Sequence, residues 1–370
     1  MTTPWLVELL DKYSSKNYHI EYDGFLSNHM IHGIIALYRL AADEKRIQEF
    51  IKFYTHKLRD PEVVKEELTI EDLKGARISY PKLVEYYRGV YRDCNNDMKT
   101  VLEKVWPQLC DGSAGSAIHG LIHLGYALSV EHDPSAIDGL AYVHHSYIPI
   151  TCEKLNKNPA IFGQGKENPF IVVNDMTEKL TDKMLNKVED ETIQKMANSY
   201  LQRRIAALFK FYPEEVLEFV GRIQVPKDVK TCLDLAYYAL HLSLIVYVKS
   251  ARKNDFFLLH GITSGWSVVQ IVKILGDCDL SRRTITVYMA ILLSAYVGQL
   301  SPKLNSTDEV KDEVNDEWWK KITEELLARE LDEHIYKLIQ VCKELWKDKG
   351  WPECPIAARI ALDHSLKFRD

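Results

Sequence analysis

The sequence lacks the short glycine-rich motifs by which most nucleotide-binding enzymes are recognised. No GxGxxG follows a strand-like segment and no GxxxxGK[ST] occurs, which excludes a Rossmann dinucleotide site and a P-loop. The HExxH motif of zinc proteases is missing too, because glycine rather than glutamate follows His119. A zinc protease built on that histidine would have no general base.

Cysteine is scarce and shows no metal-binding or disulfide pattern. The seven cysteines form no CxxC pair and are odd in number, which is typical of reduced thiols in the cytoplasm. The opening "MTTPWLVELLDKYSSK" has neither the basic start nor the long apolar core of a signal peptide. No uninterrupted apolar run reaches membrane-spanning length. We therefore expect a cytoplasmic protein that does not span a membrane.

Positive charge is not concentrated anywhere along the chain. Lysine and arginine total 47 against 53 acidic residues, for a net charge of −6, and no basic stretch is interleaved with aromatics. Nucleic acid is therefore not an expected partner. A hydrophobic content of 46% and a mean hydropathy of −0.22 describe instead a globular chain of 370 residues that can bury a large core.

Strand-like alternation is also rare, and "PFIVVND" (169–175) is the one segment that suggests a strand. Elsewhere apolar residues recur at spacings of three and four, which predicts helices over 29–58, 82–108, 116–130, 179–210, 228–250, 256–275, 281–299 and 316–348. The polar stretches 57–80, 151–168 and 300–315 are predicted loops. No long linker separates two compositions, so we predict an all-α protein with a single multi-helical domain over residues 1–370.

What the sequence does contain is histidine in unusual places. His29 and His32 lie one helical turn apart, beside small and apolar residues. His119 and His123 are spaced i,i+4, which puts both imidazoles on one helix face within reach of a common metal. The same segment carries Gly112, Gly115, Gly120 and Gly125, so its backbone must approach something closely, and a packed neighbouring helix explains this as well as a bound group does.

Two further segments add one histidine each. His260 lies in "FFLLHGITSGW", a segment apolar on nearly every side that is expected to be buried, with hydroxyl side chains as potential partners. His334 takes the central place in an aliphatic stripe that includes Leu331 and Leu338. Lys337 falls instead in a row with Glu330, Glu333, Gln340 and Glu344, and periodicity alone predicts a solvated lysine paired with Glu333.

Each of these histidines, taken singly, can be interpreted as a core residue with a satisfied hydrogen bond. Together, four separate segments send imidazoles inward, and neutral imidazole is a good ligand for iron, zinc, copper or nickel. The remaining histidines rank lower. Adjacent His144 and His145 face different ways, His132 and His241 rank with them, and His19, His56 and His364 lie in polar surroundings that predict surface positions.

Several of these segments, in this order, resemble the questin oxidase-like family. They are "NHMIHGIIALYRLAA", "AIHGLIHLGYAL" followed by "IDGLAYVHH", "DFFLLHGITS" and "DEHIYKLI", and they extend over about residues 20–350. The resemblance implies an all-helical fold and an oxygenase that opens a ring of a polycyclic aromatic substrate such as an anthraquinone, by Baeyer–Villiger-type or dioxygenase-type chemistry. It also implies a mononuclear non-haem iron held by several histidines and a lysine that carries a carboxylate.

Carried onto this chain, the resemblance implies Fe(II), with zinc as the alternative, and a ligand set drawn from His29 or His32, His119 or His123, His260, His334 and Lys337. A buried amine beside a metal has a lowered pKa, and the neutral nitrogen can add carbon dioxide. If Lys337 is unmodified, Glu333 is the nearest substitute anion. Thr263 and Ser264 are candidates for orienting oxygen or substrate, and Tyr126, Tyr142, Phe256 and Trp266 are candidates for lining an apolar pocket.

The leading hypothesis is therefore a cytoplasmic, metal-dependent oxygenase that takes O₂ and a small aromatic substrate. Such a reaction can require an external reductant such as NADPH, for which the sequence carries no recognisable site. Two alternatives stay open. One is a non-catalytic helical binding protein whose histidines serve the core or hold structural zinc, and the other is a hydrolase with a metal-activated water.

Overall fold

The computed structural model describes residues 2–61, 74–75, 80–305, 310, 312–329 and 332–365. Within them the chain forms eighteen α-helices and a single two-stranded antiparallel sheet, β1 (Glu21–Tyr22) with β2 (Leu26–Ser27), which confirms the all-α prediction. The helices are α1 (Pro4–Lys12), α2 (Met30–Arg39), α3 (Glu44–Thr55), α4 (Tyr80–Asp93), α5 (Met98–Leu109), α6 (His119–Leu128), α7 (Asp133–His145), α8 (Glu153–Lys157), α9 (Pro169–Leu185), α10 (Glu191–Met196), α11 (Tyr200–Phe211), α12 (Pro213–Arg222), α13 (Cys232–Lys249), α14 (Phe256–Leu275), α15 (Asp279–Gly298), α16 (Asp316–Leu327), α17 (Glu333–Lys349) and α18 (Glu353–Asp363).

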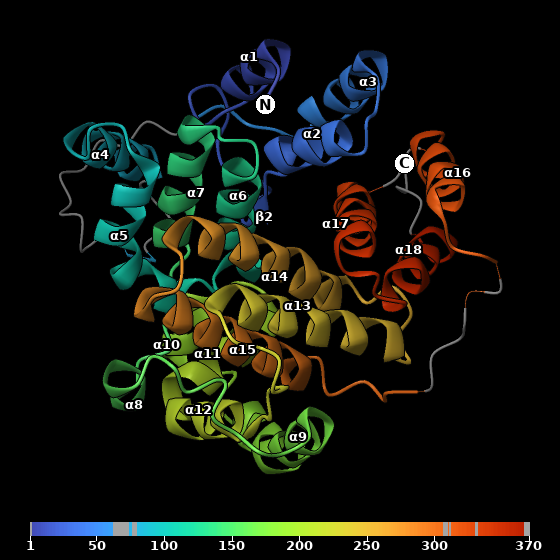
Figure 1. Cartoon of the computed structure of the whole chain (residues 1–370). Helices are drawn as coiled ribbons and strands as arrows, with labels where there is room; N and C mark the ends of the chain where they lie inside the picture. The colour runs from blue at the N-terminus through green and yellow to red at the C-terminus, as the bar shows by residue number, and fades with distance from the viewer. Residues whose placement is uncertain are drawn as a thin grey trace.

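The organising element is α14, which crosses the middle of the molecule (Figure 1). It packs against α6, α13, α15 and α17, and α2 in turn packs on both α6 and α17. Its side chains are apolar or small around most of its circumference, so a neighbour covers nearly every face. Asp255 caps its first turn and Gly276, at φ +79°, ends it.

The apolar period predicts the bounds of the long central helices well, but it does not predict where other helical segments break into shorter helices. The predicted helices 228–250, 256–275 and 281–299 are confirmed as α13, α14 and α15. The predicted helix 29–58 is broken into α2 and α3, where Ala41 has φ +60° and Asp43 caps the second helix. The segment 82–108 is likewise broken into α4 and α5, at Asn95 and Asn96 with φ +55° and +57°. At both places a backbone turn with positive φ interrupts the apolar period, and only at Asn95 and Asn96 is the turn formed by residues that favour it.

The suggestion of a strand at 169–175 is wrong, because Asn168 caps a helix there and Pro169 occupies its first position. The predicted helix 179–210 is divided among the end of α9, all of α10 and most of α11. The predicted loop 151–168 contains the short helix α8. Four further helices, α1, α7, α12 and α18, form where no helix is predicted. Some predictions fall partly outside the described residues. These are most of the loop over 57–80, part of the loop over 300–315, and residues 330 and 331 of the helix over 316–348.

Glycines set the spacing of the helices around α6. A Cβ added at Gly120 would lie 2.7 Å from the backbone nitrogen of Val143 on α7, and one added at Gly125 would lie 2.2 Å from the Cβ of Ser267 on α14. The glycine-rich segment is therefore explained by closely packed neighbouring helices. This packing brings the histidine-bearing helix α6 directly against α14.

Two described helices, α13 and α14, are long and apolar enough to cross a membrane. The core helices of soluble proteins have the same length and composition, and α14 is almost entirely buried, so the fold is compatible with a soluble protein. The buried apolar side chains of the described residues form one cluster that extends from Leu6 to Leu362.

We expect Gly125→Ala to destabilise the fold, because the new methyl group would meet both the side chain and the backbone of Ser267. Overpacking of this kind costs about 1–3 kcal/mol in the free energy of unfolding, measurable by urea denaturation. Gly89→Ala on α4 is the matched control, since its nearest neighbour would be the Arg92 guanidinium at 3.9 Å. It should gain up to about 1 kcal/mol from helix propensity. Equal stabilities of the two variants would contradict this account of the α6–α14 contact.

Candidate metal centre

Four histidines from four helices meet at the centre of the protein. They are His29, which caps α2, His119 at the start of α6, His260 on α14 and His334 on α17, and all four are buried. Successive ring centroids lie 4.4 Å apart for His29 and His119, 4.7 Å for His119 and His260, 4.9 Å for His260 and His334, and 4.4 Å for His334 and His29. The rings therefore stand at the corners of a four-sided figure.

The protonation of two of these rings follows from their partners. His119 Nδ1 bonds to the carbonyl of Ser116, and His260 Nδ1 lies 2.6 Å from the carbonyl of Phe256. A carbonyl can only accept, so Nδ1 carries the hydrogen in both rings. Burial lowers the pKa of both imidazoles well below its usual value, which keeps them neutral. Each Nε2 is then left with a lone pair.

These two lone pairs point at each other, with His119 Nε2 and His260 Nε2 only 3.1 Å apart. Two acceptors repel at that distance unless something positive lies between them. Imidazole nitrogens bound at ~2.1 Å from one metal, at a right angle, would lie about 3 Å apart. The spacing therefore matches neighbouring ligands of a single ion, and His29, His119 and His334 also bring one nitrogen each to within 4.8 Å of one another.

His334 is oriented by an acidic residue at the start of its own helix. Asp332 caps α17 by accepting the backbone N–H of His334 at 2.9 Å, and the same carboxylate accepts the ring Nδ1–H. His334 Nε2 has no hydrogen-bond partner among the described residues. A carboxylate behind an imidazole is the usual arrangement around a metal-binding histidine, because it fixes the tautomer and makes the ring a better donor.

The prediction that Lys337 and Glu333 are solvated is wrong, because α2 covers this side of α17 and both side chains are buried. Lys337 Nζ lies 3.0 Å from His29 Nδ1, and Glu333 Oε1 lies 3.5 Å from the same atom. Burial lowers the pKa of Lys337 to about 8 and raises the pKa of Glu333 to about 8. The neutral amine of Lys337 is therefore accessible near neutral pH.

The backbone that leads into His119 is strained. Ser116, Ala117 and Ile118 have φ values of +46°, +50° and +70°, a left-handed turn in which each residue with a side chain costs about 1–2 kcal/mol. This turn aims the Ser116 carbonyl at the ring of His119. Glu21 holds the turn from the other side by accepting the Ser116 hydroxyl at 2.9 Å. No glycine or asparagine marks these three positions, so sequence reasoning misses the turn.

His32 and His123 form a second group, one turn further along α2 and α6. Their ring centroids lie 4.8 Å apart with the planes at 81°, and the side chains are 0% and 2% exposed. Neither ring nitrogen of either residue has a hydrogen-bond partner in the part of the chain that the structure describes. The structure thus separates the predicted ligands into a larger group with His29, His119, His260, His334 and Lys337, and this smaller pair.

Other predicted residues lie nearby in different roles. The hydroxyl of Thr263 lies 3.4 Å from the carbonyl of His260 and that of Ser264 donates to the same carbonyl at 2.6 Å, so both contact their own helix. Of the four aromatic candidates for a pocket wall, only Phe256 lines the cavity beside the histidines, while Tyr126, Tyr142 and Trp266 are buried in the core.

The remaining histidines lie elsewhere. The prediction of a surface position is wrong for His19, which is buried with Nδ1 3.0 Å from the Glu21 carbonyl, because the rings of Tyr80 and His145 pack against it. His56 and His364 are exposed as expected. His144 is bonded to the Tyr87 hydroxyl at 2.8 Å, and His145, His132 and His241 each face a carboxylate.

A cavity of about 290 Å³ reaches the larger histidine group. Its volume is at the lower end of the ~300–1,000 Å³ typical of small-molecule sites. It is lined by Tyr22, Phe25, Leu26, Ser27, His29, Lys57, Ser116, Ala117, His119, Ser199, Gln202, Phe256, Phe257, Asp332, Glu333 and His334.

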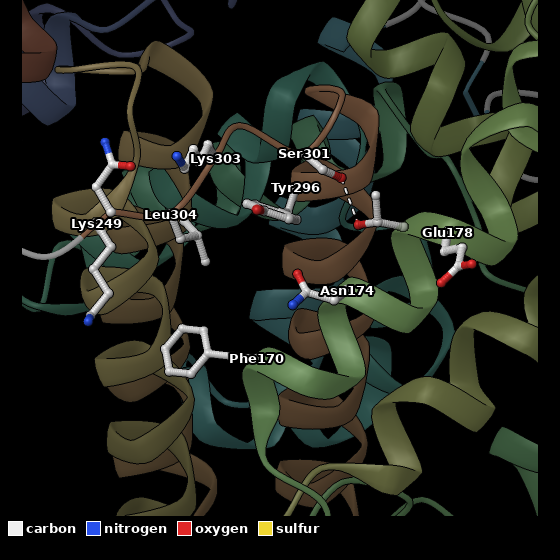
Figure 2. Close-up of a pocket in the computed structure, with 10 residues that line it drawn as sticks. Phe170, Asn174, Glu178, Lys249, Tyr296, Ser301, Lys303 and Leu304 are labelled. Carbon is white, nitrogen blue, oxygen red and sulfur yellow. Dashed lines mark hydrogen bonds between the residues drawn. The ribbon is translucent and has the colours of Figure 1, made fainter.

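A larger cavity, of about 580 Å³, lies against α9 and the segment after α15 (Figure 2). Phe170, Asn174, Tyr296 and Lys303 are among its lining residues, and Thr177 and Ser301 hydrogen-bond at 2.7 Å across it. None of the four converging histidines lines it. The smaller cavity, which contacts the buried imidazoles and the perturbed carboxyl of Glu333, is therefore the candidate site.

Most of the chain, including these residues, matches one known protein family. The sequence profile described as "Questin oxidase-like" matches residues 26–342 of the 370, which includes every residue of the histidine groups and Lys337. The chain belongs to the questin oxidase-like family. No curated protein matches the chain significantly. Family membership supports an oxidoreductase, an oxidase or oxygenase of aromatic substrates, and the histidine groups are able to hold a metal.

We expect His123→Leu to stabilise the metal-free protein, because it removes two buried nitrogens that have no partner among the described residues. An unsatisfied buried polar group costs about 1–3 kcal/mol, so the melting temperature of chelator-treated protein should rise. His144→Leu is the matched control, since this buried histidine has Tyr87 as a partner, and it should lower the melting temperature. A loss of stability in both variants would mean that His123 is satisfied.

Proposed function

We propose that this protein is a metal-dependent oxygenase in which His29, His119, His260 and His334 hold one divalent iron. The observation that carries the proposal is the 3.1 Å approach of the two Nε2 lone pairs of His119 and His260, which a cation between them would relieve. The donor set fits the metal, because neutral imidazole is a ligand of iron as well as of zinc. When bound, iron would supply the means to bring O₂ and an aromatic substrate into reaction.

Lys337 is the proposed anionic ligand, as a carbamate. Its amine is fully buried and 3.0 Å from His29 Nδ1, and its lowered pKa supports a neutral nitrogen. That nitrogen adds carbon dioxide and releases a proton, which converts a long flexible amine into a carboxylate. With one carbamate of charge −1 and neutral imidazoles, Fe²⁺ and its ligands would carry a net charge of +1. Glu333, buried at 3.5 Å from His29 Nδ1, is the alternative anion.

The cavity beside the metal ligands supports an aromatic substrate. Tyr22, Phe25, Phe256 and Phe257 supply flat apolar surface for a ring, and Lys57 adds a positive charge suited to a phenolate oxygen. In this proposal the cavity walls hold the ring against the histidines. The reaction is a ring opening or a Baeyer–Villiger-type oxidation, with an external reductant such as NADPH where the electron count requires one.

The open cavity also bears on the alternatives. Structural zinc sites are closed by four protein ligands, whereas here the cavity reaches His29, His119 and His334. That access favours a reactive centre over a scaffold. A cytoplasmic location and a single domain over the whole chain remain predictions that accompany the proposal.

Elemental analysis of protein purified without added metal should find near-stoichiometric iron. His119→Ala and His260→Ala should each lose most of it, because each removes one of the two facing donors. His56→Ala, an exposed histidine, is the control and should retain the metal. Zinc in place of iron would favour a hydrolase, and unchanged iron in both site variants would contradict the ligand assignment.

The carbamate is tested by mass and by carbon dioxide dependence. Native mass spectrometry near pH 8 should show a species about 44 Da heavier than the unmodified chain, which disappears in acid. Lys337→Met should lack it, whereas Lys343→Met, a partly buried lysine on the same helix, should keep it. Metal reloading of the wild type should be faster with bicarbonate than in carbon dioxide-free buffer. Rates independent of bicarbonate, with no mass increment, would leave Glu333 as the anion.

A further inference from the structure

Gln202 connects helix α11 to the left-handed turn that precedes His119. It lies in the first turn of α11, its side chain is buried, and it lines the smaller cavity together with Ser116 and Ala117. A buried amide requires hydrogen-bond partners, because an unpaired donor or acceptor loses its bonds to water without replacement.

The partners of this amide are two consecutive backbone N–H groups of the turn. With its oxygen facing the turn, Gln202 Oε1 accepts the N–H of Ser116 at 3.0 Å and also the N–H of Ala117. The opposite orientation would set the NH₂ group against two other donors, which excludes it. Successive N–H groups in a turn can converge on one acceptor, and here that acceptor is the side-chain oxygen of Gln202.

The same turn determines the orientation of His119. The carbonyl of Ser116 accepts both the backbone N–H of His119 and the hydrogen on its Nδ1. The direction of this carbonyl therefore decides which ring nitrogen keeps its lone pair for the interior. Ser116, Ala117 and Ile118 all have positive φ, which residues with side chains keep only when their surroundings enforce it.

Two side chains hold the turn in this conformation. Glu21 accepts the hydroxyl of Ser116 at 2.9 Å and so fixes a side chain, whereas Gln202 fixes the backbone itself. Gln202 has a firm base, because α11 packs against α15 and Arg204 donates to the carbonyl of Gly298 at 2.7 Å.

One peptide group links Gln202 to the imidazole. The N–H of Ala117 and the carbonyl of Ser116 belong to the same planar trans peptide, so they point in opposite directions. The N–H faces Gln202 and the carbonyl faces His119. Hydrogen bonds in such a chain polarise one another, so the bond to Gln202 also makes the carbonyl a better acceptor for the ring hydrogen.

We propose that Gln202 is a positioning residue that selects the Nδ1–H tautomer of His119 through the peptide group between Ser116 and Ala117. Without the amide oxygen, nothing holds the N–H side of this peptide, and the carbonyl is free to turn away from the ring. The effect on the tautomer belongs to the metal-free protein. Only its consequence for metal binding rests on the proposed function.

The test compares Gln202→Met, which keeps the length of the side chain and loses the acceptor, with Gln202→Glu, which keeps an acceptor oxygen. In metal-free protein labelled with ¹⁵N in histidine, the His119 signals are identified by their loss in His119→Ala. The wild type should show a protonated Nδ1 and an unprotonated Nε2. Gln202→Met should show a mixture of both tautomers, and Gln202→Glu should restore the wild-type pattern.

Gln270→Met is the matched control, because Gln270 is partly buried and its Nε2 lies 3.4 Å from the carbonyl of Trp266 on its own helix. It should leave the His119 signals unchanged. If Gln202→Met does not fold, the same comparison is made in an Ala117→Gly background, since glycine adopts a positive φ without strain.

Metal affinity is the second readout. Removing a group that orients a metal-bound imidazole typically weakens binding about 10–100-fold. Gln202→Met should weaken Co²⁺ binding by this factor in competition with a chromophoric chelator, whereas Gln202→Glu and Gln270→Met should bind Co²⁺ as the wild type does.

The outcomes separate this inference from the proposed function. An unchanged His119 tautomer in Gln202→Met would overturn the inference, whatever the metal affinity of the variant. A tautomer change of the same size in Gln270→Met would overturn it as well, because a general loss of packing would then explain the effect. A tautomer change confined to Gln202→Met, in a protein whose wild type binds no metal, would support the inference and overturn the proposed function instead.

Discussion

The structure depends on the burial of neutral imidazoles whose lone pairs point at one another. Burial removes the option of protonation, and the carbonyls of Ser116 and Phe256 take the Nδ1 hydrogens of His119 and His260. What remains is two acceptors 3.1 Å apart, in a place that water does not reach freely. Such an arrangement opposes folding, and in the proposed function a cation between the two nitrogens would relieve it, which would couple metal binding to the stability of the core.

Three helices contribute polar side chains to this buried region in the same way. Helices α2, α6 and α17 each place one histidine in the larger group and a second polar residue one helical turn further along. These pairs are His29 and His32, His119 and His123, and His334 and Lys337. Helix α14 contributes His260, and the hydroxyls of Thr263, Ser264 and Ser267 that follow it lie against backbone carbonyls of the same helix. These polar residues therefore lie between three helices, and the long, largely buried helix α14 covers the fourth side.

Sequence reasoning predicted the all-α class, the central helices and the inward position of the histidines that meet in the core, because an apolar period of 3.6 and a histidine on an apolar face are both local signals. It could not separate His29 from His32 or His119 from His123, since neighbours one turn apart share a helix face and only the packed partner decides between them. Lys337 shows the limit most clearly. Its own row of charged residues predicts solvent, and only the presence of α2, which no local pattern reveals, buries it. His19 is likewise buried by parts of the fold that its own neighbours in sequence do not reveal. The helix breaks at Ala41 and Asn95 were missed because positive-φ backbone conformations interrupt an otherwise continuous apolar period.

The close contact at Gly125 has a consequence for metal choice. Gly125 has no side chain and faces Ser267, and a Cβ added at Gly125 would lie only 2.4 Å from the Cα of Ser267, so α6 and α14 are closely packed here. In the proposed metal centre, the gap between His119 and His260 would therefore be set by the packing of the two helices and not by the ion. An ion whose preferred bond lengths do not match that gap must distort its own coordination, so rigid packing far from any donor atom becomes a means of discriminating among metals.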